Sequence, residues 1–207
     1  MLERPLPVTP LPRAVLFDCD GTLVDSMLAH YEGWREAFTA HGAGGVLGLD
    51  DYLGLGGVPA PGIVDHVNRK HGLALDIDSV VRVKRDKVWE FVDRLRPLEP
   101  AASWARWCHA QGILLAVASG GVRPIVLASL AAAGLDGLFP PEHVFTADEV
   151  PNGKPHPDLF LATAARLGVD PADCLVVEDA PPGIEAAIAA GMRWLDVRDF
   201  DEAGGRA

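Results

Sequence analysis

Short runs of apolar residues, bounded by turn residues, alternate with helical patterns along most of the chain. Runs of this length are typical of buried strands, and their alternation with helices is typical of βαβ units around a parallel sheet. The pattern therefore predicts an α/β protein whose sheet lies mostly in the second half of the chain. The predicted strands are Ala14 to Asp18, Ile113 to Ser119, Val144 to Thr146, Cys174 to Glu178 and Trp194 to Val197.

The stretch from residue 25 to residue 95 differs, because its apolar residues recur at helical spacing. Two glycine-rich interruptions, 42–45 and 56–62, are predicted to be loops. We therefore expect an all-helical domain of residues 25–95, inserted into a core made of residues 1–24 and 96–207. The residues that define its two apolar faces are Met27, Tyr31, Trp34 and Phe38, and then Val81, Val88, Val92 and Leu95.

The composition is that of an ordinary folded protein, with 49% apolar and 23% charged residues among 207. A net charge of −11 would repel the phosphate backbone of nucleic acid. No run reaches the roughly 18 consecutive apolar residues that a membrane helix needs, and the first residues lack the apolar stretch of a signal peptide. We therefore expect a cytoplasmic monomer that binds neither nucleic acid nor membranes.

The three cysteines, Cys19, Cys108 and Cys174, are far apart, and none belongs to a Cys-x-x-Cys pair. This spacing suggests neither a disulfide framework nor a thiolate zinc site. We expect the three side chains to lie in the core as small hydrophobes.

The first predicted strand ends in two carboxylates, Asp18 and Asp20, one residue apart and followed by Gly21 and Thr22. Because side chains alternate along a strand, both aspartates are expected on the same side. One can attack as a nucleophile while the other donates a proton to the leaving group and then activates water. The alternative is a plain turn or helix cap, which Asp and Gly also favour.

An apolar strand followed by Asp-x-Asp-Gly-Thr resembles the first motif of phosphatases in the haloacid dehalogenase superfamily. The resemblance implies a Rossmann-like parallel core with an inserted helical cap. It also implies that Asp18 forms a phospho-aspartate intermediate and that Asp20 is the acid and base. Cys19, which lies between the two aspartates, is among the residues that we expect to contact the substrate.

Two further motifs follow in the order of that superfamily. The second predicted strand of the chain ends in Ser119 and Gly120, whose hydroxyl and backbone amide suit phosphate oxygens. Ser119 is otherwise a common type of helix N-cap. Lys154 lies in a Gly-Lys-Pro-x-Pro sequence, and the resemblance implies that it neutralises charge on the phosphoryl group and the nucleophile. Arg123, in the helix after Ser119, is a further candidate for reaching the substrate.

The fourth motif places Glu178 and Asp179 at the end of another strand. Adjacent carboxylates repel one another unless a cation lies between them. These motifs bring four carboxylates and one lysine to a site that must also bind a phosphate dianion. A divalent cation is therefore expected there. Oxygen ligands and a phosphate substrate favour Mg²⁺. The resemblance implies that Asp18, Asp20 through its backbone carbonyl, and Asp179 hold the ion, with Glu178 close by.

The helical insertion resembles the branch of the superfamily that contains sugar-phosphate phosphatases and β-phosphoglucomutase. His30 matches a histidine that recurs in this branch, and Lys84 lies where some members place a lysine toward the substrate; both are otherwise ordinary residues of a helix surface. The mutase carries a Lys-Gly-x-Ser-Arg element where this chain has Gly56 to Ala60, without the two cations. Their loss argues against a mutase, which must hold a phosphate at each end of its intermediate.

These observations predict a Mg²⁺-dependent phosphatase of small phosphorylated metabolites, with sugar phosphates similar to fructose 1-phosphate as the expected substrates. An isomerase of the β-phosphoglucomutase type remains an alternative, since it shares every core residue. A phosphate-binding module without catalytic activity is a third alternative, which the intact motifs disfavour.

Overall fold

The computed structural model describes residues 9–56, 58–99 and 101–199. Its core is a five-stranded parallel sheet in the order β3-β2-β1-β4-β5, so the predicted fold class is confirmed. The strand that directly precedes Asp18, β1, is central in this order. Four strand ends, in three of the strands, differ from the prediction by one residue. The strands are β1 (Ala14–Phe17), β2 (Leu114–Ser119), β3 (Val144–Thr146), β4 (Cys174–Glu178) and β5 (Arg193–Asp196).

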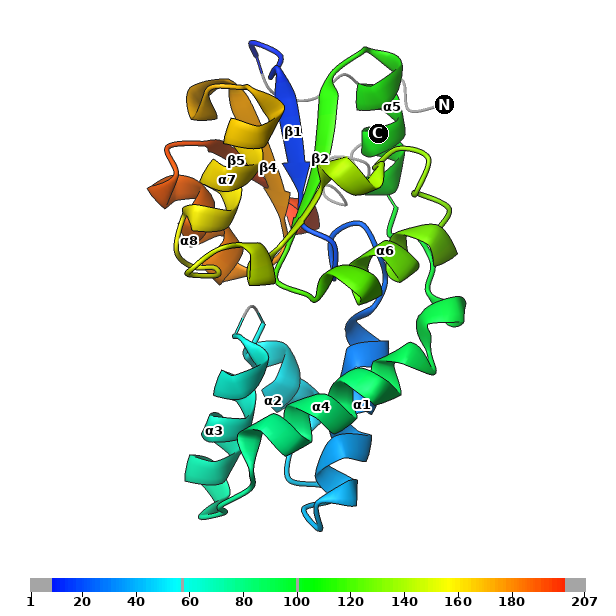
Figure 1. The fold of residues 1–207 in the computed structure, drawn as a ribbon, viewed down its shortest axis with the longest axis vertical. Coiled ribbons are helices and arrows are strands. Elements are labelled where there is room, and N and C mark those ends of the chain that lie inside the picture. The colour runs from blue at the N-terminus through cyan, green and yellow to red at the C-terminus, as the bar shows by residue number, and fades with distance from the viewer. Residues whose placement is uncertain (1–8, 57, 100, 200–207) are drawn as a thin grey trace.

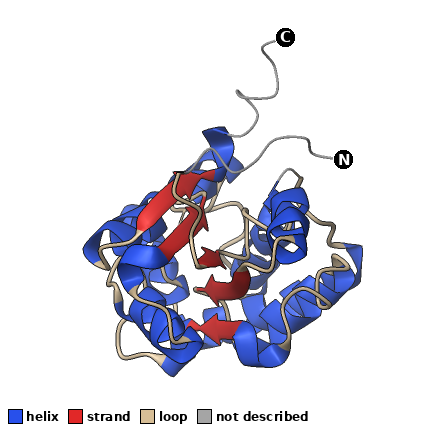
Figure 2. Ribbon diagram, turned by 90° about the horizontal axis from the view of Figure 1, so that it is seen from above, coloured by secondary structure: helices blue, strands red, loops and turns tan. Residues whose placement is uncertain are grey.

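Helices cover both faces of the sheet, as seen from above in Figure 2. They are α5 (Ala101–Ala110), α6 (Arg123–Ala132), α7 (Asp158–Leu167) and α8 (Pro181–Ala189). Short 3₁₀ turns lie at Val92–Arg94, Pro141–His143, Ala147–Glu149, Pro171–Asp173 and Val197–Asp199. These helices and the sheet are called the core below.

The two faces of the sheet bury alternate residues of the same strands. Val15 and Phe17 of β1 pack with α5 and α6, whereas Ala14 and Leu16 pack with α7 and α8. A strand that is apolar at every position can satisfy both layers at once. The polar residues that follow β1, β2 and β4 therefore begin where the buried strands end.

The helices between β1 and α5 form a separate body, called the cap below, which lies under the core in Figure 1. Its own apolar cluster includes Trp34, Phe38 and Val64. The helices are α1 (Met27–Ala40), α2 (Leu49–Gly54), α3 (Ala60–His71) and α4 (Ile77–Trp89).

Two details of the predicted cap are wrong. Val92 and Leu95 do not continue the face of Val88, because α4 ends at Trp89 and both residues pack into the core. The predicted loop 56–62 is shorter, since α3 begins at Ala60, with a proline in its first turn where the missing N–H costs nothing. Gly57 of that loop lies outside the described residues.

The two segments that connect cap and core run side by side. Val24 and Pro97 form an antiparallel bridge, and the amide of Asp25 donates to the carbonyl of Arg96 at 3.0 Å. The predicted boundaries after residues 24 and 95 fall at this crossing. Whether the two bodies fold as separate domains stays a prediction.

Among the described residues, no helix combines the length and the apolar character that a membrane crossing requires. Cys19, Cys108 and Cys174 are buried free thiols, as predicted.

Candidate active site

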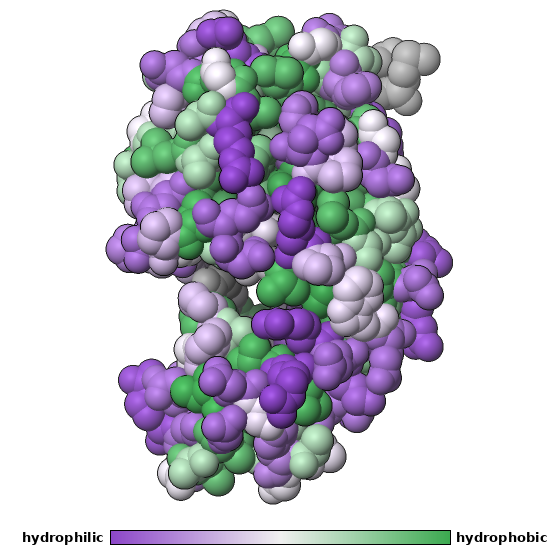
Figure 3. Space-filling view, in the orientation of Figure 1, coloured by the Kyte–Doolittle hydropathy of each residue, from purple (hydrophilic) through white to green (hydrophobic). Residues whose placement is uncertain are grey.

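A cavity of about 350 Å³ lies between the core and the cap. The surface is indented between the two bodies in Figure 3. The core contributes Asp18, Asp20, Ser119, Gly120, Gly121, Ala147, Gly153, Lys154, Glu178, Asp179, Ala180 and Gly183. The cap contributes Met27, His30, Trp34, Tyr52, Leu55, Gly56, Val58, Pro59, Ala60, Ile63 and Lys84.

Strand register explains why the core motifs meet in this cavity. Phe17 lies opposite Val117 on β2 and Val177 on β4. Asp18, Ser119 and Glu178 follow within one or two residues, so they leave the same edge of the sheet.

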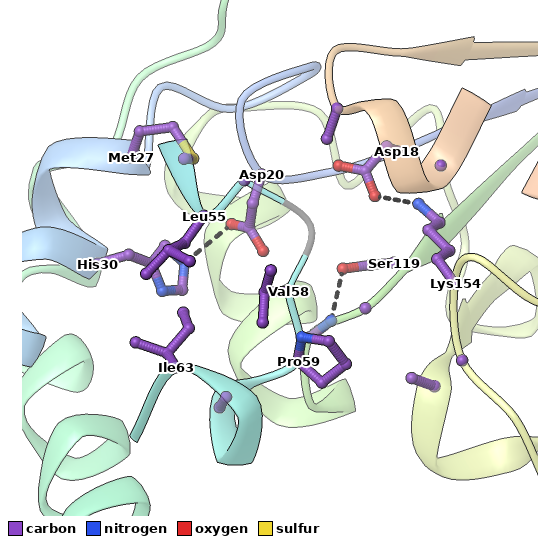
Figure 4. Close-up of a pocket in the computed structure, with 18 of the residues that line it drawn as sticks. Asp18, Asp20, Met27, His30, Leu55, Val58, Pro59, Ile63, Ser119 and Lys154 are labelled. Carbon is purple, nitrogen blue, oxygen red and sulfur yellow. Dashed lines mark hydrogen bonds and ion pairs between the residues drawn. The ribbon is translucent and has the colours of Figure 1, made fainter. Parts of the chain in front are cut away.

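Lys154 joins two of the carboxylates. Its Nζ lies 2.5 Å from Asp18 Oδ1 and 2.6 Å from Glu178 Oε1, and all three side chains are almost completely buried (Figure 4 shows the Asp18 contact). Burial raises the pKa of Asp18 well above its usual value; Lys154 opposes this effect, and Glu178 and Asp179 add to it. Burial also acts against the charged form of Lys154, but the carboxylates of Asp18 and Glu178 outweigh it and raise the pKa of the amine. The lysine is therefore a fixed cation beside Asp18.

Glu178 and Asp179 have different environments. Glu178 Oε2 accepts the backbone N–H groups of Asp179 and Ala180, so both of its carboxylate oxygens have partners within the protein. Asp179 Oδ1 accepts from the Thr22 hydroxyl at 2.8 Å. Burial and the charge of Glu178 raise the pKa of Asp179 to about 6. Asp179 is thus a carboxylate with one oxygen available to a cation.

The residues present fit a divalent metal ion. Carboxylate oxygens of Asp18, Glu178 and Asp179 lie within 4.8 Å of one another. In the described part of the chain, Asp18 Oδ2 and Asp179 Oδ2 have no hydrogen-bond partner. An oxygen-only donor set of this kind suits Mg²⁺ better than Zn²⁺.

Gly183, at the start of α8, makes room for Glu178. A Cβ atom at this position would lie 1.7 Å from Glu178 Oε1 and 2.1 Å from its carboxyl carbon. Both distances are far below van der Waals contact, so a side chain at residue 183 and the observed position of Glu178 exclude each other.

We expect Gly183→Ala to lower turnover by about a hundredfold or more, because displacing Glu178 removes one of the two carboxylates that hold Lys154. The thermal midpoint should also fall, since Glu178 is nine-tenths buried or more. Gly137→Ala is the matched control, because a Cβ there meets nothing within 4 Å. Steady-state kinetics and a melting curve of both variants test this expectation, and wild-type turnover in Gly183→Ala contradicts it.

Ser119 lies at the end of β2 and faces the cavity together with Gly120. Its Oγ accepts the backbone N–H of Gly121 at 3.0 Å (Figure 4). The N-cap of α6 is Val122, so Ser119 does not cap that helix. The hydroxyl proton of Ser119 remains available to a ligand oxygen.

Two cap residues approach Asp20. His30 Nε2 lies 3.1 Å from Asp20 Oδ1, and Lys84 Nζ lies 2.7 Å from His30 Nδ1. The Ser26 hydroxyl donates to the same Asp20 oxygen at 2.6 Å. Burial acts to raise the pKa of Asp20, but His30 and Ser26 outweigh it and hold that pKa well below its usual value. Burial lowers the pKa of Lys84 to about 8.

His30 and Lys84 are therefore not residues of a solvated helix face. His30 comes from α1 and reaches the Asp20 carboxylate of the core, and Lys84 comes from α4 and reaches His30. The contact between His30 and Asp20 is visible in Figure 4.

Two predicted substrate residues lie elsewhere. The Arg123 guanidinium donates to the carbonyls of Val144 and Pro141 and pairs with Glu149 at 3.1 Å, so it is held beside β3 and does not line the cavity. The Cys19 side chain is fully buried in the core, because it points away from the edge that carries the aspartates. The structure supports neither side chain as a substrate contact.

The sequence pattern does not predict most of the residues with which the cap lines the cavity, called the cap wall here. Trp34 and Met27 were predicted as members of an apolar face, and Tyr52, Leu55, Val58 and Ile63 were not singled out. An apolar periodicity does not distinguish a helix face that packs in a core from one that borders a cleft. Pro59 in Figure 4 is likewise part of this wall.

Enzymes with open parallel sheets place their reacting groups at the carboxyl ends of the strands. In this chain the buried ion pairs lie at these strand ends and face the helical cap. The chain therefore has the architecture of an α/β enzyme. The family model of the haloacid dehalogenase-like hydrolases matches residues 12–191. The chain therefore belongs to the haloacid dehalogenase-like hydrolase family, which confirms the predicted superfamily and the prediction of an enzyme.

Several known proteins are similar over most of the chain. Fructose-1-phosphate phosphatase YqaB of Escherichia coli K12 is 36% identical over 185 residues, which cover 89% of this chain and 95% of that protein. Hexitol phosphatase A of the same strain is 33% identical over 186 residues, which cover 89% and 82%. The crystal structure of CbbY from Rhodobacter sphaeroides in complex with phosphate matches with a TM-score of 0.79 and 26% identity, covering 89% of this chain and 85% of that one.

Proposed function

We propose that this protein is a Mg²⁺-dependent phosphatase of sugar monophosphates, with fructose 1-phosphate or a close relative as substrate. The observation that carries the proposal is the buried Asp18 carboxylate, held 2.5 Å from the Lys154 ammonium at the floor of the cavity. Two relatives that are more than 30% identical are named as phosphatases of fructose 1-phosphate and hexitols. Their names support the substrate class.

The reaction has two steps in this proposal. Asp18 attacks phosphorus, and the bond from phosphorus to the leaving oxygen breaks while Asp20 gives that oxygen a proton. Asp20 then takes a proton from water, the water oxygen attacks phosphorus, and the bond to Asp18 breaks. Because His30 and Ser26 favour the ionised form of Asp20, the proton that Asp20 gives to the leaving oxygen reaches it from His30 Nε2, 3.1 Å away, and returns there in the second step.

The remaining core residues bind the phosphoryl group. The Ser119 hydroxyl and the Gly120 amide donate to its oxygens, and Lys154 offsets their charge. Asp18, Asp179 and the backbone carbonyl of Asp20 would hold Mg²⁺, with Glu178 beside them. Bound there, the ion would offset the charge between the carboxylates and the phosphoryl oxygens.

The cap supports a phosphatase over a mutase. A mutase needs a cationic contact for a second phosphate, and the described cap residues of the cavity include one lysine, Lys84, which lies against His30. The rest of the described wall is mostly apolar. A cavity of about 350 Å³ is also at the lower end of the range for ligand pockets, which suits a small leaving group.

The test is phosphate release from a panel of hexose and pentose mono- and bisphosphates with Mg²⁺, repeated after treatment with EDTA. We expect a monophosphate such as fructose 1-phosphate to be the best substrate and EDTA to reduce its turnover at least about a hundredfold, because the carboxylates then repel the phosphate uncompensated. Adding Mg²⁺ back should restore the rate. Interconversion of β-glucose 1-phosphate and glucose 6-phosphate faster than phosphate release would favour the mutase instead.

A further inference from the structure

Among the described cap residues that line the cavity, Tyr52 of helix α2 is the one that carries a hydroxyl. Its exposed fraction is 6%, and it lines the same cavity as Asp18 and Lys154. Within the described part of the chain, its hydroxyl has no hydrogen-bond partner. The hydroxyl is not among the fully buried side-chain atoms that lack a partner, so it is open to the cavity, where a ligand or water can complete it.

The position of the ring is fixed by its neighbour. The rings of Tyr31 and Tyr52 lie 5.7 Å apart, and the Tyr31 hydroxyl donates to the carbonyl of Leu47. The two tyrosines therefore share one packing environment. The Tyr31 hydroxyl has a hydrogen-bond partner within the cap, whereas the Tyr52 hydroxyl has none among the described residues.

Tyr52 belongs to the cap wall of the cavity, opposite the core residues that are proposed to bind the phosphoryl group, and the leaving alcohol is expected on this side. Burial raises the pKa of the Tyr52 hydroxyl, and the negative charges of Asp20 and Asp179 add to that rise. Leu55, Val58 and Ile63 line the cavity beside it and offer no polar side-chain atom. His30 and Lys84 are already hydrogen-bonded to one another.

We propose that the Tyr52 hydroxyl forms a hydrogen bond to a hydroxyl group of the leaving alcohol and so selects polyhydroxylated leaving groups. The inference rests on the proposed phosphatase function and adds the group that recognises the sugar. A phenol hydroxyl can both donate and accept a hydrogen bond, which suits a hydroxyl group of a sugar. The apolar wall around Tyr52 suits the C–H faces of the sugar. A site built to bind a hydroxyl discriminates strongly against leaving groups that lack one.

The test compares Tyr52→Phe with Tyr31→Phe, each of which removes one hydroxyl and keeps the ring pair. Two substrates are used: the best sugar monophosphate of the panel above, and p-nitrophenyl phosphate, whose leaving group has no aliphatic hydroxyl. The readout is the ratio of kcat/KM for the sugar phosphate to kcat/KM for p-nitrophenyl phosphate. We expect Tyr52→Phe to lower this ratio about tenfold and Tyr31→Phe to leave it at the wild-type value.

A merely structural role would lower both rates and leave their ratio unchanged, and this result overturns the inference, as does a wild-type ratio in Tyr52→Phe. An equal fall in the ratio for Tyr31→Phe also overturns it, because the effect then comes from cap packing. Failure of the proposed function looks different: the wild-type protein would release no phosphate from any sugar monophosphate.

Discussion

Replacing Asp18 by asparagine is expected to lower phosphatase turnover by about four orders of magnitude or more, which is the scale seen when a nucleophile of a covalent mechanism is removed. The amide of asparagine is a far weaker nucleophile than a carboxylate. It also carries no charge to attract a metal ion. Phosphate release from the best substrate of the panel, measured in both proteins, gives the ratio directly.

The variant should remain folded, because asparagine has nearly the shape of aspartate. Burial already opposes the charged form of Asp18, and Lys154 keeps its contact with Glu178 at 2.6 Å. Asp136→Asn is the matched control, since Asp136 is exposed and does not line the cavity. We expect wild-type turnover from it. Retention of wild-type turnover by a folded Asp18→Asn protein would show that Asp18 is not the nucleophile.

Lys154→Met is expected to affect both activity and stability. Methionine fills a similar volume without the charge, so the carboxylates of Asp18 and Glu178 lose the cation between them. Removing one partner of a buried ion pair typically costs about 3–5 kcal/mol of unfolding free energy. Loss of the charge that faces the phosphoryl group should lower turnover by about a hundredfold to a thousandfold.

Urea unfolding at pH 7 measures the stability loss. We expect this loss to shrink at lower pH, because protonation of Asp18 discharges one of the two unpaired carboxylates. Lys70→Met is the control: Lys70 pairs with Asp51 at the surface, where ion pairs contribute little. A Lys154→Met protein as stable as Lys70→Met at pH 7 would mean that Lys154 does not hold the carboxylates together in solution.

The sheet and the core motifs can be predicted from the sequence, because each depends on the local pattern of apolar and polar residues. A strand that is apolar at every position is buried on both faces, and a polar residue at its end must then lie at the sheet edge. Asp18, Ser119 and Glu178 follow this rule, and the structure brings them to one cavity. Their catalytic roles stay predictions until the variants are measured.

The contacts of the cap are harder to predict from the sequence, because they join residues that are distant in sequence. Lys84 Nζ meets His30 across 54 positions, and nothing in the spacing of either residue distinguishes this contact from a solvated surface. Val92 continues the helical period of α4 but packs into the core, since tertiary packing overrides periodicity after Trp89. The direction of the Arg123 side chain depends on carbonyls from a segment some twenty residues away.

Detection of a phosphoryl group on Asp18 is the direct test of a phospho-aspartate intermediate. Asp20→Asn should slow the second step, because asparagine cannot take a proton from water, whereas p-nitrophenolate leaves without help in the first. Acid-quenched Asp20→Asn protein mixed with p-nitrophenyl phosphate and Mg²⁺ is therefore analysed by peptide mass spectrometry. We expect one phosphoryl group per chain, on the peptide that contains Asp18. Release of p-nitrophenolate and phosphate at equal rates, with no phosphorylated peptide at any time, would contradict it.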